Sequence, residues 1–337
     1  MTHSDTRADI PSVVERTRAL HFDAPVVSAH FLADTPIFVL GEEAVMAVEP
    51  ESEPPRIAIH SGAILSSAAD GKRLLTGGDD GRVVVIGPDF ASAGIFQDAK
   101  HRWIDNVACG PQGALAWSAG KQAYVRSERI GDRTLEAPST AGGLAFAPKG
   151  LRLAVAHYNG VSLWFPNVRS EPELLPWKGS HLKLAFSPDG RFLVTSMQEP
   201  TLHGWRLSDG KDMRMAGYSV RVRSFGWTAS GNWLATSGAN DLVLWPFQGK
   251  DGPMGKTPRM LAAAGAQVEV VACHPKQDVV AAGYADGLLL LVRVEDGAEI
   301  LARHPGGSPV SALDWNASGD TVLFGTEDGD AGVIALG

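Results

Sequence analysis

Short apolar runs separated by polar turns recur along the whole chain, and each run has the length of a β-strand. The clearest example, residues 185–195, reads Ala-Phe-Ser-Pro-Asp-Gly-Arg-Phe-Leu-Val-Thr, which predicts a strand, a tight turn and a second strand. Pro188 presets the φ angle of a turn, and Gly190 suits a position of positive φ. Similar units begin at Ala145, Gly226 and Asp314. The pattern therefore predicts an all-β protein built from repeated strand–turn–strand units.

The turn position recurs at a regular spacing along the chain. It falls at Thr35, Gly71, Gly113, Gly150, Gly190, Gly231, Gln277 and Gly319, in steps of 36, 42, 37, 40, 41, 46 and 42 residues. The fourth residue before each turn position is mostly large or sulfur-bearing, as expected between packed repeats: Phe31, Ser67, Cys109, Phe146, Phe186, Trp227, Cys273 and Trp315. Such steps are typical of four-stranded propeller blades, which take about 40–45 residues each.

Each unit continues with a polar turn, a third strand and a more polar fourth strand. Third strands are predicted at residues 83–86, 161–165, 202–207, 242–247 and 288–294. Fourth strands are clearest at residues 212–216 and 299–303. Trp164, Trp205 and Trp245 lie on third strands.

These features resemble the WD40-repeat family over roughly residues 14–337. The resemblance rests on four strands per repeat, on the turn Ser187-Pro188-Asp189-Gly190, and on Leu-Trp pairs in third strands, at Leu163-Trp164 and Leu244-Trp245. It implies a closed β-propeller of four-stranded blades. No Trp-Asp dipeptide ends a third strand and no Gly-His dipeptide opens a repeat, so the chain resembles a divergent, prokaryote-like member.

The last repeat lacks an outer strand, and the N-terminal region can supply it. Residues 14–22 carry strand-like apolar positions at Val14, Leu20 and Phe22. Pairing there would cover an exposed strand edge. Seven full repeats and one shared blade predict eight blades; seven is the alternative, if the weakly marked repeat at residues 31–59 is irregular. We expect residues 1–13 to form a polar tail and residues 14–337 to form one propeller domain.

Composition limits the classes of partner and the cellular location that we expect for the protein. The chain of 337 residues is 44% hydrophobic and carries a net charge of −8, which argues against broad binding of nucleic acid or anionic membranes. No apolar run approaches the roughly 20 residues of a membrane span, and no secretory signal is recognisable. These features favour a cytoplasmic location. Cys109 and Cys273 belong to repeats on opposite sides of the ring, which predicts buried, free thiols.

Several candidate partner-binding residues lie between the outer strand of one repeat and the inner strand of the next. His60, His101, His181 and His304 occupy such junctions. The WD40 resemblance favours a structural role for these histidines; the alternative is a titratable rim suited to a metal or an acidic partner. Arg102, Trp103, Arg221 and Arg223 start inner strands and are of residue types enriched in interface hot spots. We expect the face carrying all eight residues to be the partner site.

No catalytic motif stands out. Gly-x-Ser-x-Gly and His-Glu-x-x-His are both absent from the sequence, and no cofactor is predicted. We therefore expect a non-catalytic scaffold or adaptor, a monomer on its own, that binds a protein or an extended peptide on one face. The alternative is a propeller hydrolase or lactonase with a divalent ion in the central channel.

Overall fold

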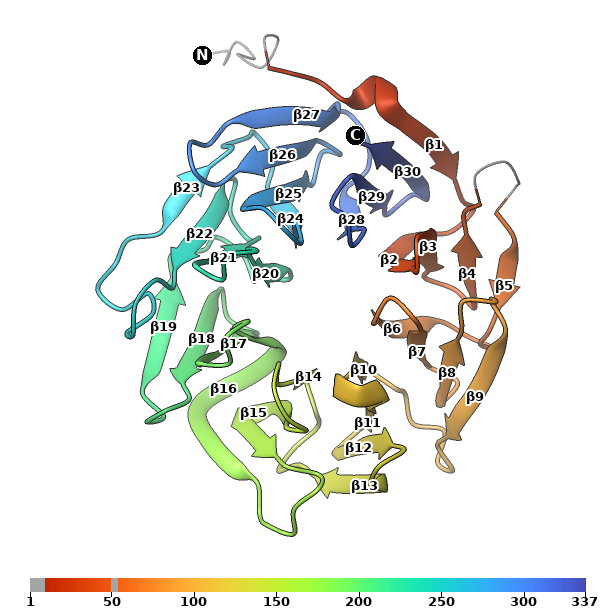
Figure 1. Ribbon diagram of the computed structural model, residues 1–337, viewed down its shortest axis with the longest axis vertical. Coiled ribbons are helices and arrows are strands. Elements are labelled where there is room, and N and C mark those ends of the chain that lie inside the picture. Colours follow the sequence, from red (N-terminus) through yellow and green to blue (C-terminus); the bar gives the residue numbers. More distant parts are fainter. Residues whose placement is uncertain (1–9, 50–53) are drawn as a thin grey trace.

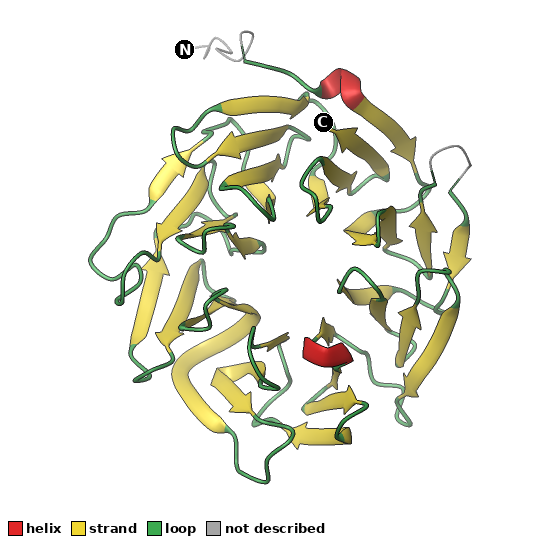
Figure 2. Cartoon of the chain, viewed as in Figure 1, coloured by secondary structure: helices red, strands yellow, loops and turns green. Residues whose placement is uncertain are grey.

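The strands of the protein form sheets arranged around a central channel, and loops and turns connect them (Figures 1 and 2). The computed structural model describes residues 10–49 and 54–337. Two short 3-10 turns, Val14–Arg16 and Pro111–Gly113, interrupt the strands. The prediction of an all-β propeller is confirmed. No helix in the described ranges is long and apolar enough to cross a membrane.

The first three repeats each form a four-stranded antiparallel sheet that runs from the channel to the rim. The first comprises β2 (Val26–Leu32), β3 (Thr35–Leu40), β4 (Ala44–Ala47) and β5 (Arg56–Ala58). The second comprises β6 (Ile64–Ala69), β7 (Leu74–Gly78), β8 (Arg82–Ile86) and β9 (Ser92–Gln97). The third comprises β10 (Asn106–Cys109), β11 (Leu115–Ala119), β12 (Gln122–Ser127) and β13 (Gly131–Glu136).

The last three repeats follow the same plan. The sixth comprises β20 (Phe225–Trp227), β21 (Trp233–Thr236), β22 (Leu242–Pro246) and β23 (Arg259–Leu261). The seventh comprises β24 (Val268–Cys273), β25 (Val279–Tyr284), β26 (Leu289–Arg293) and β27 (Glu299–Arg303). The eighth comprises β28 (Val310–Trp315), β29 (Thr321–Thr326), β30 (Asp330–Ala335) and, from the other end of the chain, β1 (Thr17–His21).

The fourth and fifth repeats share one six-stranded sheet. Its order is β14 (Gly143–Phe146), β15 (Leu153–Trp164), β16 (Glu173–Phe186), β17 (Phe192–Met197), β18 (Thr201–Arg206) and β19 (Asp212–Ala216). The first half of β15 pairs with β14 and its second half with β16, so β15 supplies the second and third strands of the fourth repeat. Positive φ angles at Asn159 (68°) and Gly160 (148°) mark the reversal. Likewise β16 pairs first with β15 and then with β17, so it joins the two repeats.

Strand pairing among the described residues therefore gives seven sheets, six with four strands and one with six. This count supports the alternative of seven blades. The expected reason was an irregular repeat at residues 31–59, and the structure shows a different one. The repeat at residues 31–59 is regular and forms β2 to β5, whereas the pairing of Tyr158 with Ser180 keeps two repeats in one sheet. Each of the eight sequence repeats contributes strands to one of these sheets.

The predicted closure of the ring is confirmed. Strand β1 pairs antiparallel with β30, from Thr17 opposite Ile334 to His21 opposite Asp330. The Phe22 N–H extends this pairing by donating to the Gly329 carbonyl oxygen at 2.9 Å. The strand begins later than residue 14 because Val14–Arg16 forms a 3-10 turn. Upstream of the turn, the Val13 N–H donates to the carbonyl oxygen of Leu301 in β27 at 2.8 Å.

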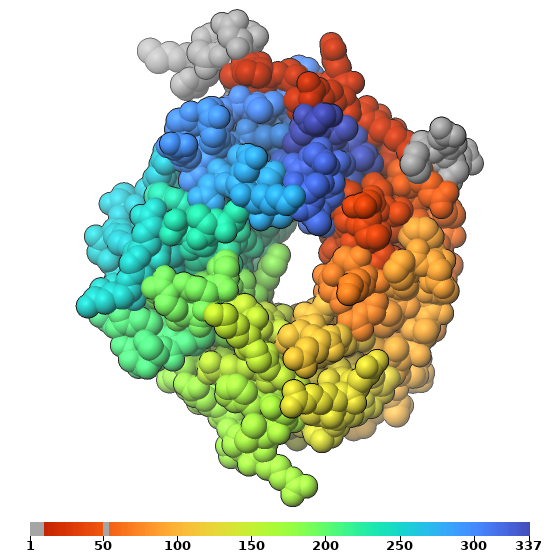
Figure 3. Space-filling model, in the orientation of Figure 1, coloured from red at the N-terminus to blue at the C-terminus, as the bar shows by residue number. Residues whose placement is uncertain are grey.

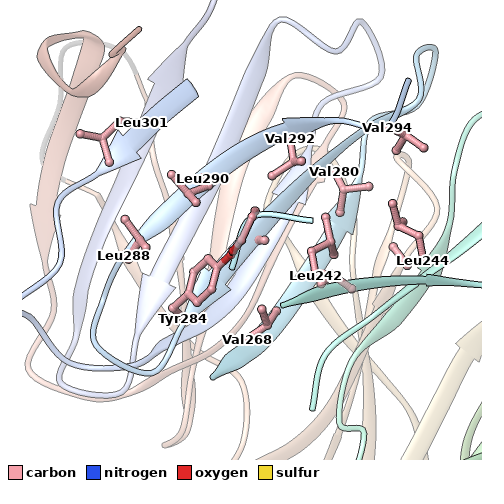
Figure 4. Packing of buried hydrophobic residues seen from close by; sticks show 14 residues of the cluster. Leu242, Leu244, Val268, Val280, Tyr284, Leu288, Leu290, Val292, Val294 and Leu301 are labelled. Carbon is pink, nitrogen blue, oxygen red and sulfur yellow. The ribbon is translucent and has the colours of Figure 1, made fainter. Parts of the chain in front are cut away.

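The core consists of apolar clusters packed between neighbouring sheets. Figure 4 shows one of them, in which Leu242 and Leu244 of the sixth repeat face Val280 and Leu290 of the seventh. Burying each such side chain is worth roughly 1.5–3 kcal/mol. In most repeats, the predicted core residue before the turn is the last paired residue of the inner strand: Cys109, Phe146, Phe186, Trp227, Cys273 and Trp315.

Candidate binding site

The predicted partner-binding residues divide into buried or braced side chains and exposed ones. His60, His181 and Arg102 make several hydrogen bonds to their own surroundings. His101, Trp103, Arg221, Arg223 and His304 lie at least partly in contact with solvent. The division shows which of these side chains are accessible to a partner without rearrangement of the fold.

His60 is buried and ties the junction before the second repeat to that repeat's β7–β8 hairpin. Its Nε2 lies 2.9 Å from Thr76 Oγ1, and its Nδ1 lies 3.0 Å from Asp80 Oδ1. The Ser61 and Arg82 N–H groups also donate to Asp80, each at 3.0 Å. Burial alone would raise the pKa of Asp80, but these hydrogen bonds outweigh it and lower the pKa. The arrangement supports the structural role for His60.

Arg102 braces the loop that carries His101 and Trp103. Its Nη2 donates to Asp98 Oδ1 at 2.6 Å, and its Nη1 donates to the Ala119 carbonyl oxygen at 3.0 Å. The hydrogen bond from Arg102 lowers the pKa of the Asp98 carboxyl. Trp103, 60% exposed, projects from this braced loop. Arg102 therefore holds a possible contact residue in place while its own charge is already neutralised.

His181 is buried in β16 and anchors a tryptophan that the sequence prediction missed. Its Nε2 lies 3.0 Å from the Trp177 carbonyl oxygen, and its Nδ1 lies 2.8 Å from Thr195 Oγ1. Because a carbonyl oxygen can only accept, Nε2 carries a proton. Burial lowers the pKa of His181, which favours the neutral ring with this single tautomer.

Trp177 is stacked on the buried ring of His203 in β18. The two ring centroids lie 3.9 Å apart, with 17° between the planes. Neither ring nitrogen of His203 has a hydrogen-bond partner among the described residues. Burial, and then the charges of His181 and Arg214, lower the pKa of His203 to about 3. The imidazole under Trp177 is therefore neutral at physiological pH and serves as a flat, uncharged support.

A groove opens over this stack on the surface of the six-stranded sheet. Its volume is about 610 Å³, within the range of about 300–1,000 Å³ that ligand pockets occupy. Trp177, 36% exposed, and Tyr158, 54% exposed, supply aromatic surface to it. The remaining lining residues are Lys178, Gly179, Ser180, Met197, Gln198, Glu199, Thr201 and Arg214. The groove thus combines aromatic surface with charges of both signs.

Arg221 lies next to this groove, and Arg223 lies farther along the junction before the sixth repeat. The Arg221 Nη1 donates to Oε1 of Gln198, which lines the groove, at 3.0 Å. This acceptor is a neutral amide, so the bond leaves the charge of Arg221 available to an acidic partner. Arg223 is 3.7 Å from a carboxylate oxygen of Glu269. Arg221 is therefore the predicted residue that extends the groove.

Trp177 and Tyr158 could have been recognised from their positions. Trp177 lies in β16, directly after Pro176, which pairs with Gly160, and it precedes Lys178-Gly179. Tyr158 belongs to the polar turn of the fourth repeat. A search for aromatic residues at junctions and turns, where the repeat requires no core side chain, would have found both.

The central channel has a different character. Figure 3 shows that it is open. A cavity of about 400 Å³ in its wall is lined by inner strands of the first five repeats, and Lys183 is the charged side chain in that lining. Within the part of the chain that the structure describes, no group of three or more His, Cys, Asp or Glu residues could hold a metal ion.

Both cysteines are free, as predicted, but they are half-buried rather than fully buried. Burial raises the pKa of each thiol to about 12. The Cys109 thiol lies 3.5 Å from the Ala68 carbonyl oxygen, in contact with the preceding repeat. High pKa values make both thiols poor nucleophiles.

Comparison with known proteins adds information on the fold. No family model matches the chain. The crystal structure of the computationally designed Ika8 protein is similar, with a TM-score of 0.74 and 17% sequence identity. The similarity covers 94% of this chain and 97% of that one. At this identity the likeness shows a shared fold and carries no information on activity or partners.

Proposed function

We propose that this protein is a binding scaffold that holds a partner protein or an extended peptide in the groove over the fourth and fifth repeats. The observation that carries the proposal is the Trp177–His203 stack, at 3.9 Å, beneath an open groove. A tryptophan that is already fixed loses little conformational freedom on binding, so more of its contact energy appears as affinity. Tryptophan and tyrosine are also enriched among interface hot spots.

The charges around the groove indicate what the partner carries. Arg221 is bonded to a neutral amide rather than a carboxylate, at the edge of the aromatic surface. We infer that the partner places an apolar or aromatic side chain against Trp177 and an acidic side chain near Arg221. Such a pairing would fix the orientation of the bound segment.

The remaining parts of the proposal rest on the sequence. We propose a divergent WD40-type propeller that acts as a cytoplasmic monomer and does not bind nucleic acid, in keeping with its net charge of −8. The alternative of a channel metal and hydrolytic activity has less support, since a lysine lines the channel cavity and would repel a divalent cation.

The proposal is tested by panning a random peptide display library against the purified protein. We expect enriched peptides that combine an aromatic and an acidic residue. In fluorescence titrations, Trp177→Ala should weaken their binding at least about tenfold, which corresponds to roughly 1.4 kcal/mol. Trp103→Ala is the matched control, because it removes an exposed tryptophan that does not line the groove.

Two outcomes would overturn the groove as the site. One is equal binding by the wild-type protein and the Trp177→Ala variant. The other is loss of binding in Trp103→Ala alone, which would move the site to residues 98–105. Affinity purification from the native host, with the wild-type protein, Trp177→Ala and Trp103→Ala as baits, then identifies the partner by mass spectrometry.

A further inference from the structure

Lys183 occupies an unusual position in the channel wall. It lies on β16 at the inner edge of the fifth repeat and lines the cavity of about 400 Å³. The approach of β14 to this segment is close, since a Cβ on Gly143 would lie 2.5 Å from the Leu182 carbonyl oxygen. Glycine at that position therefore lets the neighbouring strand pack beside Lys183 without a side chain of its own.

Ser196 Oγ donates to the Lys183 backbone carbonyl oxygen, whereas the ammonium group has no hydrogen bond or ion pair with any described residue. Water in the channel reaches the side chain, yet the surrounding strands enclose it enough for burial to lower its pKa. The charge also acts across the cavity wall: burial, and then Lys183, lower the pKa of His30 to about 4. The cavity thus contains a positive charge that no described carboxylate neutralises.

Hydroxyl groups lie in the same cavity wall. Ser28 and Ser67 line the cavity, and their Oγ atoms lie 2.6 Å apart. The Nε2 atom of His30 lies 2.8 Å from Ser67 Oγ. If His30 donates to Ser67 and Ser67 donates to Ser28, the proton of the Ser28 hydroxyl is left to donate to a ligand.

The rest of the lining is mostly apolar, apart from Ser66 and Asn106, and parts of it are exposed to solvent. Val27 and Leu65 belong to the large hydrophobic side chains that remain exposed, and both line the cavity. The other apolar lining residues are Val39, Ile64, Val107, Leu144 and Leu184. A ligand that matches both parts of the wall carries one negative group and a short apolar body.

We propose that the channel cavity binds a small organic carboxylate. Its carboxylate pairs with the Lys183 ammonium and accepts a hydrogen bond from Ser28, and its alkyl part packs on Leu65, Leu144 and Leu184. Binding supplies a counter-charge that no described carboxylate provides to Lys183. This site is separate from the groove of the proposed partner and does not depend on it.

The test is isothermal titration calorimetry with hexanoate on the intact protein, with inorganic phosphate as a second probe. We expect saturable 1:1 binding of hexanoate, and much weaker binding of phosphate, which cannot use the apolar wall. Lys183→Met, which keeps the chain length and removes the charge, should weaken hexanoate binding by more than about tenfold. Lys183→Arg should keep most of it, and Lys149→Met, on an exposed turn, should have no effect.

Ser28→Ala gives a second line of evidence if Lys183→Met fails to fold. It should weaken hexanoate binding by about tenfold or more, the value of one lost hydrogen bond to a charged group. The proposal is overturned if hexanoate does not saturate the wild-type protein or if a folded Lys183→Met binds it equally well. Phosphate binding as tight as hexanoate would likewise overturn the assignment to an organic carboxylate.

Discussion

The second and fifth repeats use a histidine from the same kind of junction in different ways. In the second repeat, both ring nitrogens of His60 lie near side chains of that repeat, Thr76 and Asp80. In the fifth, His181 contacts Thr195 on one side and the backbone of Trp177 on the other. One histidine completes a closed polar network, whereas the other holds an exposed aromatic residue in place.

The difference shows where a regular ring can acquire a binding site. In the closed network the His60 side chain is fully buried and that of Asp80 is 8% exposed, and the aspartate is held by the Ser61 and Arg82 N–H groups. The fifth repeat instead leaves His203 without hydrogen-bond partners among the described residues and covers it with Trp177. A buried polar group without a partner costs stability, and such local costs are common at functional sites.

The largest expected effect is on the closed network. His60→Ala should lower the free energy of unfolding by about 2–4 kcal/mol, because it opens a cavity and leaves Thr76 and Asp80 short of a partner. Urea denaturation followed by tryptophan fluorescence measures the change. His304→Ala, at an exposed junction, should cost less than about 0.5 kcal/mol. A similar midpoint for both variants would show that the His60 network does not hold the ring.

His181→Ala separates stability from binding. We expect a loss of about 2–3 kcal/mol in stability, since a buried ring and two hydrogen bonds are removed. Unlike His60→Ala, it should also weaken peptide binding several-fold, because the Trp177 backbone loses its anchor. The comparison fails if the two variants, both measured in the folded state, bind the selected peptide with the same affinity.

His203→Phe tests the unpartnered ring through the pH dependence of stability. Since burial lowers the pKa of His203 to about 3, the unfolded chain takes up a proton near pH 6.5 and the folded chain does not. The contribution of His203 to stability is therefore complete above pH 6.5 and is lost as the pH falls toward 3. Phenylalanine keeps the stack on Trp177 and has no such proton.

The expected result is a stability advantage of His203→Phe over the wild-type protein that is larger at pH 4 than at pH 7. Denaturant midpoints at the two pH values measure it. Asp212 Oδ2 lies 3.8 Å from His203 Nε2 and would favour the protonated ring. If Asp212 determines the protonation of His203, the stability advantage of His203→Phe over the wild-type protein will be smaller at pH 4 than at pH 7.

The smallest effect concerns the rim of the groove. Arg221→Gln removes the charge and keeps a polar side chain, so peptide affinity should fall about threefold, mainly through a slower association rate. The difference should vanish at high salt, because salt screens exposed charges. Stopped-flow binding at two ionic strengths checks both points. A drop that persists at high salt would mean that Arg221 acts through a buried contact.

Much of this architecture follows from the chain's periodicity. The outer strands β19 and β27 have the predicted bounds, residues 212–216 and 299–303. The joined sheet could not be predicted, because it depends on the backbone pairing of Tyr158 with Ser180 across a turn that looks ordinary in sequence. In the second repeat, the inner strand continues past Ser67, and its last pair is Ala69 with Leu74.

The candidate site, like the joined sheet, could be predicted from the sequence only in part. Junction position was enough to select His60 and His181, because the repeat places them there. It did not reveal which histidine supports an exposed ring, since that depends on the stacking of Trp177 on a side chain from another strand. Periodicity predicts where a side chain lies along a strand, whereas the groove arises from contacts between strands.

The seam between β1 and β30 has a consequence for how the protein is made. Thr17 and Ile334 are paired although nearly the whole chain separates them. At about 5–20 residues per second of translation, β1 leaves the ribosome some tens of seconds before its partner exists. An apolar edge exposed for that time would invite aggregation. The sequence of β1, Thr-Arg-Ala-Leu-His, is instead short and largely polar. The unpaired strand can therefore remain solvated until the last repeat is synthesised.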